Sequence, residues 1–151
     1  MTLTAPRIDH LLVSTDGAAP ARWIETFSNG QICRNDHLPS ARPGLIWVWL
    51  DLGVEPSEVM EPIKQHFGID VPIAVMSRIP SPVEAVKALQ QGAKAYLNAH
   101  ALPVVLQRVH DTVSSGAVWL GADLVDFLSA ALHVDASTTP SESSQSWRSQ
   151  L

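Results

Sequence analysis

Short apolar runs alternate with amphipathic stretches along this chain, and this alternation limits its fold more than any other feature. Four runs have the length and the β-branched or aromatic content of strands: residues 8–14, 45–50, 71–77 and 94–98, with 30–34 as a weaker candidate. Four other stretches place apolar residues at helical spacing: 19–28, 56–67, 81–92 and 102–116. Continuous apolar strands separated by helices predict an α/β fold, a doubly wound parallel sheet covered on both faces.

Two segments depart from this alternation. Residues 35–44, NDHLPSARPG, contain two prolines and a glycine where the alternation requires a helix, so they predict a loop or a single helical turn. Residues 134–151 are rich in Ser and Thr and poor in apolar residues, which is typical of a flexible linker or tail. The expected organisation is therefore one domain over residues 1–133 and a linker over 134–151.

The charge and cysteine content exclude several classes of function. The 151 residues include 10 Lys and Arg against 15 Asp and Glu, so the chain lacks the basic field that phosphate neutralisation needs. The single cysteine, Cys33, cannot form an internal disulfide, and the first residues lack a secretory signal. No apolar run approaches the ~18 residues of a membrane span. We expect a cytoplasmic location, no membrane contact and no nucleic-acid binding by this segment.

The stretch GLIWVWLDLG, residues 44–53, ends a predicted strand in one carboxylate, Asp51. In most folds an Asp at this place starts a turn or caps a helix. Ser77 and Tyr96, taken alone, are a loop residue and a half-buried aromatic residue. The 6 histidines show no metal-ligand spacing, so the residues by themselves predict no metal site.

Residues 71–128, VPIAVMSRIPSPVEAVKALQQGAKAYLNAHALPVVLQRVHDTVSSGAVWLGADLVDFL, resemble the second half of a receiver domain of two-component response regulators, specifically the NarL/FixJ (LuxR-type) class. The specific pieces are VMS at the end of a strand, EAVKALQQGAKAYL as a helix and a short strand, and VSSGAVWLGADL after the last helix. The resemblance covers residues 44–132 and extends loosely to HLLVSTDG near the N-terminus. It implies a flavodoxin-like sheet of five parallel strands in the order 2-1-3-4-5, with the second helix shortened or absent.

The resemblance also implies roles for residues at the carboxyl ends of the strands. Asp51 aligns with the aspartate that accepts a phosphoryl group from a histidine kinase. Ser77 aligns with the switch hydroxyl that binds the phosphoryl group, and Tyr96 with the aromatic residue that changes rotamer with it. The family's site also needs Mg²⁺, held by an acidic pair after the first strand, and a lysine after the fifth strand.

Two of these parts are missing from the aligned positions. Ser14 and Thr15 replace the acidic pair, with Asp16 one position late, and the lysine position holds Asn98 or Ala99. A lone carboxylate binds Mg²⁺ poorly because this ion prefers two or more anionic oxygens. We therefore expect weak or absent Mg²⁺ binding, no cofactor and no catalytic residue. The sequence predicts a degenerate receiver, or pseudo-receiver, that is not an enzyme.

Two alternatives remain open. One is a conventional receiver that is phosphorylated on Asp51. The other is a flavodoxin-like small-ligand binder or enzyme, with Asp51, Ser77 and Asp16 around a substrate in a pocket of a few hundred Å³.

The resemblance implies that the domain acts through protein–protein association in transcription regulation. Receivers of this class are followed by a linker and a helix-turn-helix domain, so DNA binding is expected only through a domain after residue 151. A histidine kinase or another regulatory protein is an expected partner, and so is a second copy of the chain. The homodimer contact is expected on the segments 81–92, 94–98 and 102–116, through Val86, Lys87, Leu89, Leu106, Arg108 and Val109, with Glu84 and Asp111 as further rim charges.

Overall fold

The computed structural model describes residues 8–121, 124–127 and 129–130 of the chain. The chain divides into two compact units, with the boundary between Trp119 and Leu120. In the second unit, residues 124–127 and 129–130 are helical. The linker predicted over 134–151, and its boundary with the domain predicted over 1–133, lie outside the described residues.

Strands and helices alternate over residues 8–120 as the sequence predicts, apart from one missing helix. The strands are β1 (Ile8–Ser14), β2 (Gln31–Arg34), β3 (Pro43–Leu50), β4 (Ile73–Ser77), β5 (Ala95–Asn98) and β6 (Trp119–Leu120). The helices are α1 (Ala21–Thr26), α2 (Pro56–Phe67), α3 (Pro82–Gln90) and α4 (Pro103–Ser114). Residues 35–42 form only turns and bends, so the helix between β2 and β3 is absent, in agreement with the prediction. Proline opens three of the helices, at positions where its missing N–H costs no hydrogen bond.

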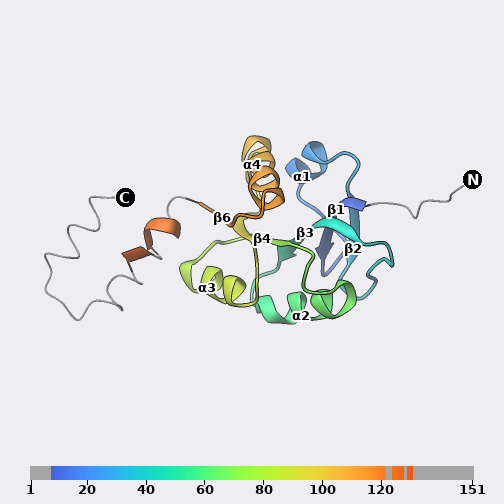
Figure 1. Ribbon diagram of the computed structural model, residues 1–151, viewed down its shortest axis with the longest axis horizontal. Helices are drawn as coiled ribbons and strands as arrows, with labels where there is room; N and C mark the ends of the chain where they lie inside the picture. The colour runs from blue at the N-terminus through green and yellow to red at the C-terminus, as the bar shows by residue number, and fades with distance from the viewer. Residues whose placement is uncertain (1–7, 122–123, 128, 131–151) are drawn as a thin grey trace, which may run out of the picture. The chain divides into compact units, whose positions relative to one another are not determined.

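The sheet has the order β2-β1-β3-β4-β5-β6, and the pairs from β2 to β5 are parallel (Figure 1). The predicted doubly wound α/β fold and the order 2-1-3-4-5 are confirmed. The predicted count of five strands is corrected to six. The added strand, β6, has 2 residues, which is too short to produce a periodic sequence signal.

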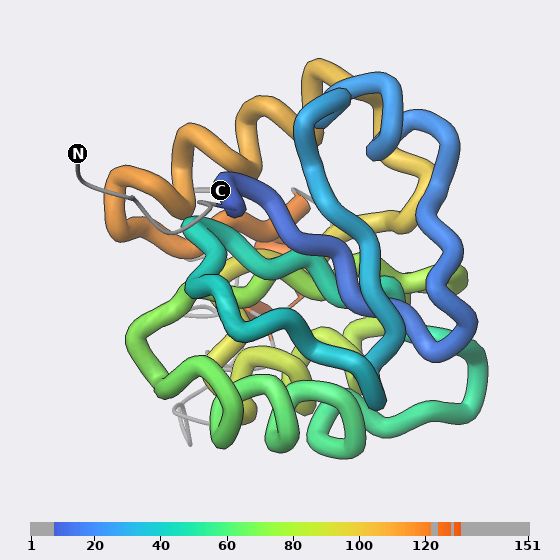
Figure 2. The backbone as a smooth tube through the Cα atoms, turned by 90° about the vertical axis from the view of Figure 1, so that its right-hand side faces the viewer, coloured from blue at the N-terminus to red at the C-terminus, as the bar shows by residue number. Residues whose placement is uncertain are grey.

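Helices cover both faces of the sheet: α1 and α4 lie on one side, and α2 and α3 on the other (Figures 1 and 2). Successive strand side chains point to opposite faces, so the apolar strands feed two core layers. The layer under α1 and α4 includes Leu12, Trp23, Phe27, Trp47, Met76, Leu97, Leu106 and Val109. Among the described residues, no helix is long and apolar enough to cross a membrane.

The first prediction concerns Gly30, which packs against α1. A Cβ atom at this position would lie 2.6 Å from Cη2 of Trp23 and 3.0 Å from the carbonyl oxygen of Phe27. Because Trp23 is fully buried, it cannot move aside freely. Gly30→Ala should lower the free energy of unfolding by about 1–3 kcal/mol, measured by urea denaturation. Ser28→Ala, at an exposed neighbouring position, is the control and should change it by less than about 0.5 kcal/mol. Equal effects of the two substitutions would contradict this account of the packing.

Candidate functional site

The carboxyl ends of the parallel strands bring the predicted site residues to one edge of the sheet. Leu50 of β3 is level with Ser77 of β4, and Ser77 is level with Asn98 of β5. Asp51 follows Leu50 directly, and Thr15 follows β1, the neighbouring strand on the other side of β3. The edge lies at the point where the strand order reverses, which is where ligands bind in open α/β sheets.

The carboxylate of Asp51 is engaged through both of its oxygens. Oγ1 of Thr15 donates a hydrogen bond to Oδ2, and Nε of Arg78 donates to Oδ1 at 3.1 Å. The guanidinium carbon of Arg78 lies 4.6 Å from the ring centroid of Trp49, a cation–π contact. The Arg78 and Asp51 side chains are 40% and 35% exposed, so water screens the ion pair and it contributes at most about 1 kcal/mol. The carboxylate therefore already has a cation beside it, supplied by the chain itself.

Arg78 did not emerge from the sequence analysis. Its position directly after Ser77, at the end of β4, is the one signal that could have indicated it, because a side chain there starts from the edge that carries Asp51. The side chain of a basic residue in a loop can point in several directions, and no spacing or motif in the sequence indicates that Arg78 points toward Asp51.

The residues at the acidic-pair positions shape a turn. Oγ of Ser14 donates to the carbonyl oxygen of Ala18 at 2.7 Å, and the exposed Asp16 accepts from the backbone N–H of Ala18 at 3.0 Å. Among the described residues there is no group of three or more His, Cys, Asp or Glu side chains that could hold a metal ion. Asp51 with the hydroxyl of Thr15 is a poor set of ligands for Mg²⁺, so these residues do not fit the ion that the fold family implies.

Ser77 and Tyr96 lie together in the interior. Tyr96 is fully buried, and its hydroxyl donates to Oε1 of Glu84 at 2.6 Å while accepting from the backbone N–H of Ser81 at 3.0 Å. Ser81 caps α3 by accepting from the N–H of Glu84 at 3.1 Å. Burial, followed by the bond to Glu84, raises the pKa of Tyr96 to about 12, and an interaction with Ser77 opposes this shift. Glu84, expected as a rim charge, is thus tied to the switch-equivalent tyrosine.

The lysine position carries no cation at this edge. Oδ1 of the exposed Asn98 accepts from the N–H of His100 at 2.8 Å, and Ala99 is buried, with its N–H donating to the carbonyl oxygen of Ser77 at 2.8 Å. Lys94 precedes β5, so it lies at the amino end of that strand and away from Asp51.

Two of the residues expected at the homodimer contact are buried in the core of the single chain and cannot lie at its surface. Leu106 and Val109 are 1% and 0% exposed because the apolar stripe of α4 that contains them faces the sheet. Val86 and Leu89 of α3 are half-buried. The two charged members are on the surface: Lys87 pairs with Glu55 at 3.0 Å, and Arg108 is exposed.

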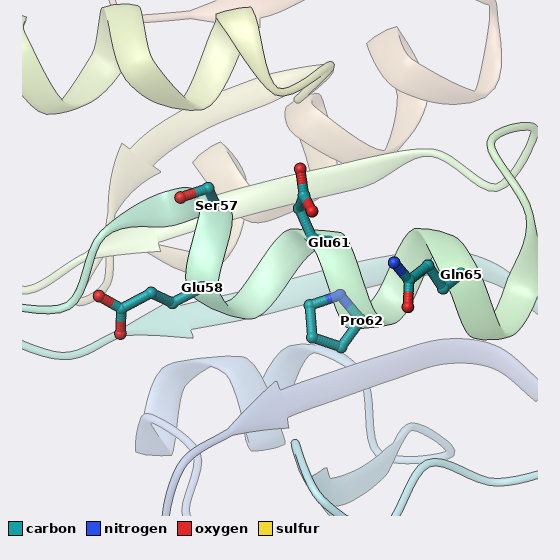
Figure 3. A pocket seen from close by; sticks show the side chains of 5 residues that line it. All are labelled: Ser57, Glu58, Glu61, Pro62 and Gln65. Atoms are coloured by element: carbon teal, nitrogen blue, oxygen red, sulfur yellow. The ribbon is translucent and has the colours of Figure 1, made fainter.

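Two surface hollows of several hundred Å³ lie away from Asp51. One, of about 460 Å³, is lined entirely from α2, by Ser57, Glu58, Glu61, Pro62 and Gln65 (Figure 3). The other, of about 410 Å³, lies at the amino ends of the strands beside α4. Neither includes Asp51, Ser77 or Asp16, so neither supports a ligand site in the switch-point crevice.

Comparison with known proteins places this geometry in a known fold. The chain matches no protein-family model and no curated protein sequence. It is similar in structure to a LuxR-family two-component response regulator from Aurantimonas sp. SI85-9A1, with a TM-score of 0.58 and 14% identity over 78% of this chain and 93% of that one. It is also similar to the isolated receiver domain of RcsB from Salmonella enterica serovar Typhimurium, solved with a beryllofluoride phosphomimetic, with a TM-score of 0.57 and 12% identity over 78% and 96%. The chain therefore has the receiver fold.

The second prediction concerns the pair at the site. In a double-mutant cycle with Asp51→Asn and Arg78→Ala, the coupling energy should be about 0.5–1 kcal/mol, because the pair is half-exposed but also held by Thr15 and Trp49. Urea denaturation of the four proteins measures it. The exposed pair of Lys87 and Glu55, studied in the same way, is the control and should couple by less than about 0.5 kcal/mol. A coupling of zero for Asp51 and Arg78 would mean that the pair is not maintained in solution.

Proposed function

We propose that this chain is a regulatory receiver-like module of a two-component-type response regulator, and that it works by protein–protein association without a phosphoryl cycle at Asp51. The observation that carries this proposal is the engagement of both Asp51 oxygens, by Thr15 and by Arg78. The receiver fold supports the regulatory role. In this reading the domain is cytoplasmic and is not an enzyme.

Phosphorylation requires an oxygen of Asp51 to attack phosphorus while cations neutralise the transferring oxygens. In this chain both carboxylate oxygens accept hydrogen bonds, and the charge-assisted bond from Arg78 makes Oδ1 a weaker nucleophile. The positions that would hold Mg²⁺ have other bonds: Ser14 and Asp16 both bond to Ala18. These contacts favour a slow or absent reaction over the conventional phospho-accepting alternative.

The burial and the hydrogen bonds of Tyr96 support a domain whose switch residue keeps one conformation. Its hydroxyl donates to a carboxylate, a charge-assisted bond that is stronger than a neutral one, and the ring is fully buried. Rotating the ring outward would leave Glu84 and the N–H of Ser81 without this partner, at a cost of about 1–3 kcal/mol. A receiver whose switch tyrosine is fixed has no phosphorylation-dependent change of conformation to transmit. It can regulate only by binding another protein, and that partner must prefer one conformation of the domain over the others.

The outer surface of α1 and α4 is the contact that we propose for a homodimer. Ile24 of α1 and Val104 of α4 are 46% and 57% exposed, and Leu102, just before α4, is 53% exposed. Arg22 of α1 donates to the carbonyl oxygen of His100, in the loop that precedes α4, at 2.6 Å. Exposed charges of both signs, including Glu25 and Arg108, suit a self-complementary two-fold contact. A histidine kinase or another regulatory protein is the alternative partner, and DNA would be bound only by a domain beyond residue 151.

The third prediction tests the phosphoryl chemistry. Incubated with acetyl phosphate or phosphoramidate and Mg²⁺, the protein should gain almost no phosphoryl group by intact-mass spectrometry, because Asp51 is bonded and lacks a metal partner. Arg78→Ala separates the two causes: if the bond to Arg78 is the main obstacle, this variant should be modified faster than the parent.

Asp51→Asn is the matched control for both proteins. Efficient modification of the parent that is lost in Asp51→Asn would refute the proposal and establish a conventional receiver. Modification that persists in Asp51→Asn lies on another residue and leaves the proposal standing.

The fourth prediction tests the association surface. Sedimentation velocity should detect a concentration-dependent dimer without any phosphoryl mimic, and Ile24→Glu or Val104→Glu should weaken it about tenfold or more by burying a charge. Val83→Glu, at a position that is 66% exposed but lies on α3 at the opposite face, is the control and should have no effect. Weakening by Val83→Glu alone would assign the contact to α3, and a monomer at all concentrations would favour a different partner protein.

A further inference from the structure

A cluster of four rings at the amino end of the sheet joins β1 and β3 to α1 and α4. His10 of β1 is 6% exposed and stacks on Phe27, the residue that ends α1, with ring centroids 4.0 Å apart and an interplanar angle of 26°. His110 of α4 meets the His10 ring edge-on at 4.7 Å. Phe27 also contacts Trp47 of β3 at 5.1 Å. Through His10 the end of α1 and the middle of α4 share one contact.

The hydrogen bond of His10 requires the imidazole to be neutral. Nε1 of Trp47 donates to Nδ1 of His10 at 3.2 Å, and an indole N–H can only donate. Nδ1 must therefore present a lone pair, which places the proton of the neutral ring on Nε2. If Nδ1 took up a proton, two N–H groups would face each other at this distance, and the bond would be lost.

A hollow of about 410 Å³ opens beside this cluster. Its lining includes both imidazoles, Asp9, Asn29 and Ser114, so its wall is partly polar. Water and protons can thus approach His10 although the ring is buried.

The charged groups around His10 oppose protonation. The titratable groups that face it are His110 on α4 and Asp9 on its own strand, while α1 and β3 contribute the uncharged rings of Phe27 and Trp47. Burial, followed by repulsion from His110, lowers the pKa of His10 to about 4, and attraction to Asp9 acts in the opposite direction. Nδ1 of His110 lies 3.5 Å from Oδ1 of Asp111.

We propose that His10 is a proton-sensitive latch between α1 and α4: uptake of one proton on Nδ1 breaks the bond from Trp47, places a positive charge against the ring of His110 and releases the two helices from each other. The released surface is the one that we assign to association, and in that respect alone the inference rests on the proposed function. Opening of the latch itself is a property of the single chain.

The pH range follows from the linkage between proton binding and opening. The pKa of His10 is lowered in the closed structure from its ordinary value of 6.5, so the opened state binds the proton more readily. The latch is fully stabilised above about pH 6.5 and loses stability as the pH falls toward about 4. In this range, each fall of one pH unit should raise the population of the open state by up to tenfold.

Hydrogen exchange resolved by NMR tests the latch. After correction for the intrinsic exchange rate, amides of α1 and α4 should exchange up to about tenfold faster for each unit by which the pH falls between about pH 6.5 and pH 4.5. Amides of α2 and α3 should show no such acceleration. The indole N–H resonance of Trp47 should titrate with the same dependence. His10→Gln supplies an amide oxygen as a non-titrating acceptor for Trp47, and it should abolish both effects.

The controls separate the latch from other causes. His110→Gln should keep the pH dependence but end it at a higher pH, because removing the repulsion raises the pKa of His10 in the closed structure. Equal acceleration in all four helices, no acceleration in the parent protein, or an unchanged pH dependence in folded His10→Gln would each overturn the inference. Should His10→Gln fail to fold, the parent and His110→Gln decide the matter. Opening is a property of the single chain, so failure to detect a dimer would refute the proposed homodimer contact without affecting this result.

Discussion

The parallel register of β1, β3, β4 and β5 is the constraint on which the rest of the structure depends. Because parallel strands end at the same edge, this register delivers Thr15, Asp51, Ser77 and Asn98 to one place. Helices on both faces hold it, since a slip of one residue would turn every buried strand side chain to the opposite face. The two core layers thus fix the geometry of the site, and a few residues after the strands decide its chemistry.

At that edge, the cation beside Asp51 is the guanidinium group of Arg78, whereas the resemblance to receivers implies a metal ion and a lysine. Mg²⁺ and an ammonium group act on the phosphoryl oxygens as they transfer, but Arg78 bonds directly to an oxygen of the carboxylate that would attack. Arginine stays charged at every physiological pH, and stacking on Trp49 helps to hold it in place. Asp51 and Tyr96, to which the resemblance assigns the phosphoacceptor and switch roles, thus both have intramolecular partners. These contacts describe a receiver fold whose site is already satisfied by its own side chains.

Much of this fold could be predicted from the sequence, because continuous apolar strands and amphipathic helices have distinct periods. The alternation and the missing helix agree with the predictions made from the residues themselves. The strand order and the shared edge of Asp51 and Ser77 agree with what the resemblance to receivers implied. The site was less predictable where the role of a residue depends on the direction in which its side chain points. Periodicity identified an apolar stripe on α4 but could not say that Leu106 and Val109 face the sheet while Val104 faces outward. Glu84 and Arg78 have ordinary positions in sequence, and only the folded chain brings them to Tyr96 and Asp51.

A crystal structure of the protein grown with Mg²⁺ and beryllofluoride tests the central claim most directly, because beryllofluoride bound to an aspartate mimics a phosphoryl group. The account predicts that Nε of Arg78 still donates to Oδ1 of Asp51 near 3.1 Å, that Tyr96 still donates to Glu84, and that no beryllofluoride is bound to Asp51. Beryllofluoride bound to the Asp51 carboxylate, with Mg²⁺ beside it and Arg78 displaced, would contradict the account.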